Sequence, residues 1–180
     1  MTTAADLLAA VRSTYPKAAV VREVSITDSQ VEAEMNLWRL MGTRRSYWEK
    51  YLAETGGPVA DSLPAGWTPY NTPPVRRIDA LMRETAGYTA IEIKVTRADF
   101  KRDTDEKRRA WQAHTRRFIY VTPAGLVNVS EVPANCGLWE FDGSRLRVVK
   151  KATINKEPLA MPRSVFDTML YRVSNYERAA

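Results

Sequence analysis

Two segments of alternating polarity, Ile78–Thr85 and Thr89–Val95, constrain the fold of this chain most. Each alternates like a half-buried strand, and the short Ala86-Gly87 link between them predicts a tight hairpin turn. Successive side chains of a strand point to opposite faces, and a slip of one residue would turn every apolar side chain to the wrong face. We therefore expect three apolar pairs on one face: Ile78 with Val95, Ala80 with Ile93, and Met82 with Ile91.

The opposite face of this hairpin carries three polar residues that suit metal-dependent chemistry. The expected register places Asp79 across from Lys94, with Glu92 on the diagonal. Two carboxylates and the Ile93 carbonyl are hard oxygen ligands of the kind that Mg²⁺ or Mn²⁺ takes. Lys94 would orient or deprotonate an attacking water and offset phosphate charge. The alternative is a surface Glu-Lys pair on an ordinary strand, which the matching Asp79 and the shared register disfavour.

The net charge of +6 is concentrated beside these residues. The segment Lys94–Arg117 holds nine basic and four acidic residues. A basic patch next to a candidate metal site is typical of a protein that binds a phosphate backbone, although a solvated, salt-bridged helix face explains the charge run taken alone. The cations that we expect to contact phosphates without reading sequence are Arg76, Arg77, Arg97, Lys101, Arg102 and Arg108.

The remaining pattern predicts one α/β domain over residues 1–180. A first strand at 18–24, a helix at 6–14, a helix that opens at Thr96, a second helix that enters at 103–106 and runs to about His114, a strand at 118–122 and a hairpin over 137–149 indicate a mixed sheet flanked by helices. A C-terminal helix is expected at 163–177. Residues 29–75 form an insertion between the first two strands. Its arginines and tryptophans suit a DNA-contacting flap, but we place a local apolar cluster ahead of that, and a dimer contact is a third interpretation.

Composition excludes several classes of protein. The single cysteine, Cys136, permits no internal disulfide. Residues 1–10 lack the features of a signal peptide, and no apolar run is long enough to span a membrane. We therefore expect a cytoplasmic protein that does not enter a membrane.

The nine-residue run Glu92-Ile93-Lys94-Val95-Thr96-Arg97-Ala98-Asp99-Phe100 resembles the PD-(D/E)xK nuclease superfamily, and within it small bacterial and phage MmcB-like DNA-repair proteins. The resemblance covers about residues 18–24 and 75–150. It implies a restriction-endonuclease-like αβββαβ core and a metal-dependent phosphodiesterase site with Asp79, Glu92 and Lys94 in the roles given above. One departure is Ile78, which stands where the family pattern often has proline.

Two further positions match by this resemblance. Glu23 matches an acid that such proteins often place before the motif, where it binds a second metal ion or its water; an exposed strand glutamate is an equally good interpretation. Lys107 matches a helix residue that reaches back to the site, and it lies one turn before Trp111 on the helix stripe that faces the sheet. A purely solvated lysine is the alternative there.

The function that these residues predict is a Mg²⁺- or Mn²⁺-dependent deoxyribonuclease that leaves a 5′-phosphate. It would act in DNA repair, phage DNA processing or host–virus conflict, with DNA as its partner; folds of this kind often form homodimers. The first alternative is a catalytically inactive nuclease fold that binds DNA or a protein, for which clustered acids near phosphate would be unfavourable. The second is an inhibitor of another nuclease or defence system that uses the tryptophan-bearing insertion.

Overall fold

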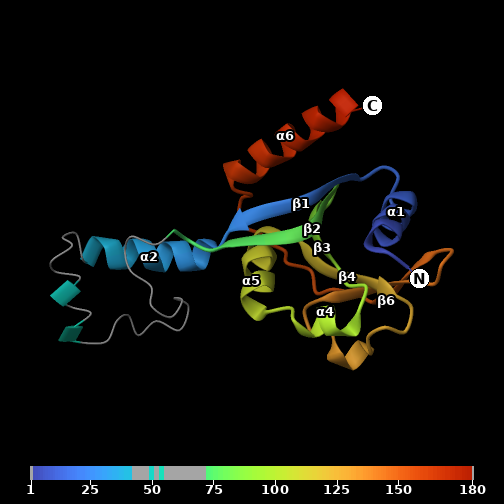
Figure 1. Ribbon diagram of the computed structural model, residues 1–180, viewed down its shortest axis with the longest axis horizontal. Coiled ribbons are helices and arrows are strands. Elements are labelled where there is room, and N and C mark those ends of the chain that lie inside the picture. The colour runs from blue at the N-terminus through green and yellow to red at the C-terminus, as the bar shows by residue number, and fades with distance from the viewer. Residues whose placement is uncertain (1, 42–48, 51–52, 55–71, 180) are drawn as a thin grey trace. The chain divides into compact units, whose positions relative to one another are not determined.

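The computed structural model describes residues 2–41, 49–50, 53–54 and 72–179 (Figure 1). The chain contains α1 (Ala4–Thr14), β1 (Ala19–Thr27), α2 (Ser29–Met41), β2 (Val75–Glu84), β3 (Gly87–Ile93), α4 (Arg97–Lys101), α5 (Asp105–His114), β4 (Arg117–Pro123), the 3-10 helix η1 (Val129–Glu131), β5 (Gly137–Phe141), β6 (Leu146–Lys150) and α6 (Arg163–Ala179). The helix expected at 163–177 is therefore confirmed and runs two residues further.

Six strands form one sheet whose spatial order follows the chain, from β1 to β6. β2 and β3 are antiparallel, β3–β4 and β4–β5 are parallel, and β5 and β6 are antiparallel. Parallel neighbours need a crossover connection. Between β3 and β4 that crossover consists of α4 and α5 (Figure 1). The mixed α/β sheet flanked by helices that the sequence predicts is thus present.

Each face of the sheet buries its own apolar cluster. On one face α1 contributes Leu7, Leu8 and Val11, which pack with Ile91, Ile93 and other strand residues. On the other face Ala110 and Trp111 of α5 pack with Phe118, Tyr120 and Leu138. Burying one such side chain contributes roughly 1.5–3 kcal/mol. The two clusters pack the central strands β3 and β4 between helices, which positions the polar side chains at their ends.

Threonine caps decide where three helices begin. Thr3 and Asp6 form a reciprocal capping box at α1. Thr96 Oγ1 accepts the N–H of Asp99 at 3.1 Å at the start of α4, and Thr104 Oγ1 accepts the N–H of Lys107 at 3.4 Å at the start of α5. The crossover is therefore broken into two short helices, and of the residues between them Asp103 turns inward while Arg102 and Thr104 stay exposed.

The register expected for the β2–β3 hairpin is wrong by two residues. Ala80 pairs with Ile91 rather than Ile93, and the turn consists of Thr85 and Ala86 rather than Ala86 and Gly87. The physical reason lies at Gly87, whose φ of +141° lets a two-residue turn close directly onto Glu84.

A shift of two residues keeps the faces, so Ala80, Met82, Ile91 and Ile93 still share the α1-side cluster. Ile78 does not join them, because it packs in the cluster beneath α5. The alternation of β2 is therefore interrupted at Asp79, the residue between Ile78 and Ala80.

Residues 27–76 form a compact unit separate from the unit made by 1–26 and 77–180. The boundaries lie within two residues of the expected insertion. Within this unit the carboxylate of Asp28 accepts the N–H of Val31 at the start of α2, at 3.4 Å, and lies 3.5 Å from Nε of Arg76. Most of the residues that suggested a flap lie outside the described part of the chain: Arg44, Arg45, Tyr47, Trp48 and Trp67.

Among the described residues, no helix has both the length and the apolar composition needed to cross a membrane.

Candidate functional site

Asp79 marks the place where β2 and β3 stop pairing through their backbones. Ala80–Ile91 is the last recorded pair of the ladder, and beyond it Oδ2 of Asp79 accepts the N–H of Ile93 at 2.7 Å. Continued by one step, the observed register sets Asp79 opposite Glu92, and not opposite Lys94 as the sequence suggested. The carboxylate of Asp79 thus takes the place of a backbone carbonyl as the acceptor for the N–H of Ile93, and it is held beside the end of β3.

Glu92 is buried in the face of the sheet beneath α5, with 3% of its surface exposed. Its Oε1 lies 3.0 Å from Nζ of Lys94 and 2.5 Å from Nζ of Lys107. Its Oε2 is buried and has no hydrogen-bond partner among the described residues. Burial, followed by the charge of Asp79, raises the pKa of Glu92, and the two lysines offset only part of this rise. One carboxylate oxygen is therefore left available to a further cation or donor.

Lys94 is enclosed by carboxylates, with 5% of its surface exposed. Besides Glu92, its Nζ lies 3.8 Å from Oδ1 of Asp99 and 3.6 Å from Oδ1 of Asp103. Burial alone would lower the pKa of this ammonium, but the surrounding carboxylates raise the pKa above its ordinary value. The arrangement therefore favours Lys94 as a fixed positive charge that orients or neutralises, over a role in deprotonating water.

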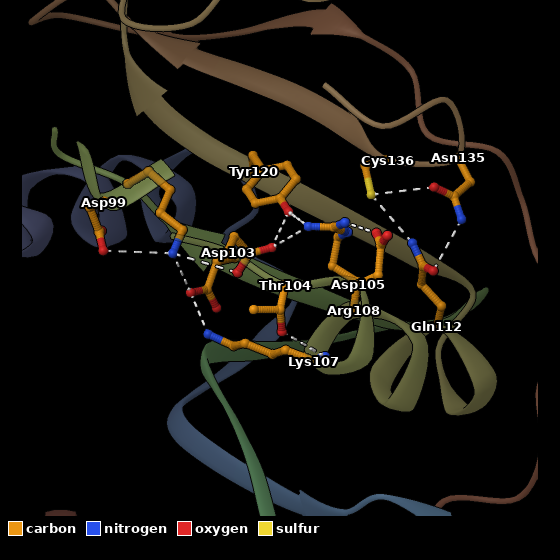
Figure 2. A network of polar contacts seen from close by, with 12 residues as sticks. Asp99, Asp103, Thr104, Asp105, Lys107, Arg108, Gln112, Tyr120, Asn135 and Cys136 are labelled. Atoms are coloured by element: carbon orange, nitrogen blue, oxygen red, sulfur yellow. Dashed lines mark hydrogen bonds and ion pairs between the residues drawn. The ribbon is translucent and has the colours of Figure 1, made fainter. Parts of the chain in front are cut away.

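Lys107 reaches the site from the first turn of α5. The Thr104 cap fixes the start of that helix, and Figure 2 shows the lysine side chain extending from the helix into the polar network. The 2.5 Å contact with Glu92 is the reach toward the site that the family resemblance implied. Its role in catalysis stays a prediction.

A second group in the network was not anticipated from the sequence. Figure 2 shows Asp103 between the helices, with its Oδ2 accepting from the hydroxyl of Tyr120 and, at 2.8 Å, from Nη1 of Arg108. The sequence offered one sign of this, the position of Asp103 relative to the start of α5. Asp103 precedes the Thr104 cap, so the first-turn acids that interact favourably with the helix dipole are Asp105 and Glu106. An acid placed just before a cap is free to turn inward.

The predicted phosphate-binding cations differ in availability. Arg108 departs from the prediction, because its side chain is only 12% exposed and its guanidinium contacts Asp103, Asp105 and Tyr120. Tyr120 and Asp103 hold the guanidinium of Arg108 within the protein. A count of charges along the sequence cannot predict this contact.

The other cations lie closer to solvent. The side chain of Arg102 is 76% exposed, and that of Arg97 is 47% exposed while it contacts Glu131 at 2.6 Å. Lys101 and Arg77 are exposed, whereas Arg76 pairs with Asp28 in the other compact unit. The α4 segment therefore presents three of the expected cations to solvent: Arg97, Lys101 and Arg102.

Glu23 has no recorded contact with this network. It lies on β1, which β2 separates from β3, and its carboxylate lies 3.3 Å from Nη1 of Arg172 on α6. Its backbone has a φ of +51°, a left-handed conformation within a strand. Val21 and Val24 both pack in the cluster beneath α5 although they are three positions apart, which would place them on opposite faces of a regular strand, so the strand is irregular at Glu23.

The residues at the end of β3 suit a divalent cation with few protein ligands. Within the described part of the chain, no group of three or more His, Cys, Asp or Glu side chains is arranged to hold a metal ion. Mg²⁺, however, commonly keeps most of its waters and takes only one or two carboxylates. Asp79, Glu92 with its unpartnered Oε2, and the Ile93 carbonyl fit that pattern.

Comparisons with known proteins assign no family. No family model matches the chain, and no match is found among curated proteins. A solved structure, described as a protein of unknown function from Silicibacter pomeroyi, is 20% identical with a TM-score of 0.42; the match covers 57% of this chain and 66% of that one. The matched region is thus just under two thirds of that protein, a likeness that carries no argument about function.

Proposed function

We propose that this protein is a metal-dependent nuclease that hydrolyses DNA phosphodiester bonds, with a restriction-endonuclease-like core of the PD-(D/E)xK superfamily. The observation that carries the proposal is the unpartnered, buried Oε2 of Glu92. It lies beside a second acid, Asp79, whose charge raises the pKa of Glu92. A buried carboxylate and a half-buried carboxylate that repel each other are stabilised when a divalent cation binds between them.

Each residue of the site has a task in this proposal. Asp79, Glu92 and the carbonyl of Ile93 would hold Mg²⁺ or Mn²⁺, which when bound supplies positive charge at the scissile phosphate and lowers the pKa of a water molecule. Lys94 orients the attacking water and neutralises charge that develops on the phosphate. Lys107 can turn from Glu92 toward a phosphate oxygen, since its side chain is 25% exposed.

The substrate follows from the charges around the site. The exposed cations of α4, which are Arg97, Lys101 and Arg102, would contact the backbone of DNA without reading bases. DNA repair, phage DNA processing and host–virus conflict are the settings in which such an enzyme would act, and a cytoplasmic location is part of the proposal.

Cleavage of plasmid and oligonucleotide DNA with Mg²⁺ or Mn²⁺ tests the proposal. We expect Asp79→Asn, Glu92→Gln and Lys94→Met each to lower the rate on the order of 100-fold or more. Glu157→Ala, which replaces an exposed acid outside the network, serves as the control. Activity that persists in all three site variants would place the chemistry elsewhere or reveal a contaminating nuclease.

A non-catalytic nuclease fold that binds DNA or a protein is the second candidate. One observation favours it: Oε1 of Glu92 already contacts two ammonium groups, which partly replace the charge of a cation. Calorimetric titration with Mn²⁺ separates the candidates. Binding of DNA that weakens steeply with salt, together with no binding of Mn²⁺, would favour the second.

A further inference from the structure

Asp103 is a buried carboxylate to which the proposed chemistry gives no task. Its side chain is 2% exposed, and it belongs to the short loop between α4 and α5, where its N–H donates to the carbonyl of Phe100 at 3.2 Å. Burying a carboxylate is costly unless donors or cations compensate for the lost hydration. The contacts of Asp103 show which donors and cations compensate for its lost hydration.

One oxygen of Asp103 is held by two donors. Oδ2 accepts from the Tyr120 hydroxyl and from Nη1 of Arg108, which is itself 3.2 Å from that hydroxyl (Figure 2). Tyr120 is fully buried, and its ring makes edge contacts with Phe100 at 5.1 Å and Phe118 at 5.4 Å. Burial raises the pKa of Tyr120, so its hydroxyl stays a donor. The carboxylate of Asp103 is therefore fixed by groups that cannot easily move.

The other oxygen of Asp103 faces the lysine of the site. Oδ1 lies 3.6 Å from Nζ of Lys94, is buried, and makes no hydrogen bond within the described part of the chain. The same ammonium lies 3.0 Å from Glu92 Oε1 and 3.8 Å from Oδ1 of the partly exposed Asp99. The ammonium thus contacts two buried carboxylates, one of which is a predicted metal ligand while the other is not.

We propose that Asp103 is a positioning residue, held by Tyr120 and Arg108, that fixes the ammonium of Lys94 in its contact with Glu92. Attraction to both carboxylates holds the cation between β3 and the α4–α5 loop. Without the charge of Asp103, Lys94 would lose an ion-pair partner in that loop and would be held less firmly beside the proposed divalent cation. This inference rests on the proposed function only where it concerns that cation; the placement of Lys94 can be tested without it.

The first test observes Lys94 directly in the full-length protein. Asp103→Asn removes the charge and keeps an oxygen that can accept from Tyr120 and Arg108, so the fold should persist. The ¹⁵N NMR signal of the Lys94 ammonium, assigned by its loss in Lys94→Met, should shift, and its proton exchange with solvent should become about tenfold faster or more. The same signal with an exchange rate changed by less than about twofold would overturn the proposal.

Asp105→Asn is the matched control. Asp105 also accepts from Arg108, but its side chain is 91% exposed and it has no recorded contact with Lys94. The control should leave the Lys94 signal unchanged. An equal response in both variants would mean that Arg108, and not the charge of Asp103, governs Lys94, and would overturn the proposal.

Tyr120→Phe provides a second variant if Asp103→Asn does not fold. It keeps the packed ring and the charge of Asp103 but removes one of the two donors that fix the carboxylate. We expect an intermediate acceleration of Lys94 exchange. An exchange rate equal to that of the parent protein would overturn the role assigned to the Tyr120 contact.

Metal binding and cleavage then separate this inference from the proposed function. Asp103→Asn should lower kcat by about 10- to 100-fold, with little change in KM, because Lys94 is no longer held in place. A parent protein that neither binds Mn²⁺ nor cleaves DNA would refute the nuclease, while the NMR comparison would still decide the positioning role. A cleaving parent with an unchanged kcat in Asp103→Asn would refute the positioning role alone.

Discussion

The ammonium of Lys107 lies 2.5 Å from Oε1 of Glu92, the same oxygen that Lys94 contacts at 3.0 Å. A carboxylate expected to hold a metal ion is therefore already balanced by positive charge from the protein. A divalent cation must compete with these ammonium groups. Lys107 is the more exposed of the two and belongs to the first turn of a helix, so it is the one free to leave.

This competition predicts opposite effects of one substitution on metal binding and on cleavage. Lys107→Met should tighten Mn²⁺ binding by roughly three- to tenfold, equivalent to ~0.7–1.4 kcal/mol, because the competing charge is removed. Cleavage should nevertheless slow, because the ammonium that could turn to the phosphate is also lost. Calorimetry measures the first effect, with Lys151→Met, an exposed lysine outside the network, as control. Weaker Mn²⁺ binding in Lys107→Met would contradict the competition.

Asp142 predicts a pH-dependent contribution to stability. Its Oδ1 accepts the N–H groups of Ser144 and Arg145, each at 3.0 Å, and the Ser144 hydroxyl at 2.7 Å. Hydrogen bonds from Arg145 and Ser144 hold the pKa of Asp142 below its ordinary 3.8. The unfolded chain therefore binds a proton first as pH falls, so the contribution is complete above 3.8 and is lost as pH falls through the lower folded pKa.

Asp142→Ala should accordingly lower Tm at neutral pH, and the difference from the parent should shrink steadily as the solution becomes more acidic than that ordinary value. Thermal melts across acidic buffers measure this trend, with Glu157→Ala as an exposed control. A difference in Tm that stays constant down to the most acidic buffer would show that the turn is stabilised by something other than the ionised carboxylate.

The labelling rate of the Cys136 thiol is predicted to report unfolding of the protein. Cys136 is the single cysteine of the chain, it is fully buried, and Nε2 of Gln112 donates to its sulfur at 3.3 Å. Burial raises the pKa of the Cys136 thiol to about 11. Labelling by a thiol-specific disulfide reagent at mildly alkaline pH should be on the order of 100-fold slower in the native protein than in denaturant. Rapid labelling of the native protein would mean that this part of the core opens readily.

Gly137 predicts a packing constraint on β5. A Cβ built at this position would lie 2.5 Å from Cδ1 of Ile119 and 3.1 Å from both the Ala152 nitrogen and the Lys150 carbonyl oxygen. Two of these neighbours are backbone atoms that cannot rotate away. Gly137→Ala should lower the free energy of unfolding by about 1–3 kcal/mol in denaturant titrations. Ser130→Ala, at an exposed position, should change it little.

The faces of the central hairpin could be predicted from the sequence, but its register could not. The period of two assigns Ala80, Met82, Ile91 and Ile93 to one face whichever of two registers forms. A shift of two residues preserves that match, so apolar pattern alone cannot choose between the registers. The choice depends on the turn, where the backbone conformation of Gly87 permits closure onto Glu84.

The part of the polar network made by Asp103, Arg108 and Tyr120 could not be predicted from the sequence, for a different reason. Glu92, Lys94 and Lys107 follow a recognisable pattern along the chain, whereas Tyr120 comes from the neighbouring strand. Tyr120 pairs with Glu92 across the parallel β3–β4 ladder, a contact fixed only when the crossover closes. Asp103 and Arg108 both contact that tyrosine, so the burial of Arg108 had no local sign in the sequence, and that of Asp103 had only its position just before the Thr104 cap.

All members of the polar network, from Asp79 to Tyr120, belong to one uninterrupted stretch of the chain that comprises a hairpin, a crossover and the next strand. The reactive groups are therefore encoded together in one contiguous segment of the gene, so a single recombination event would transfer all of them.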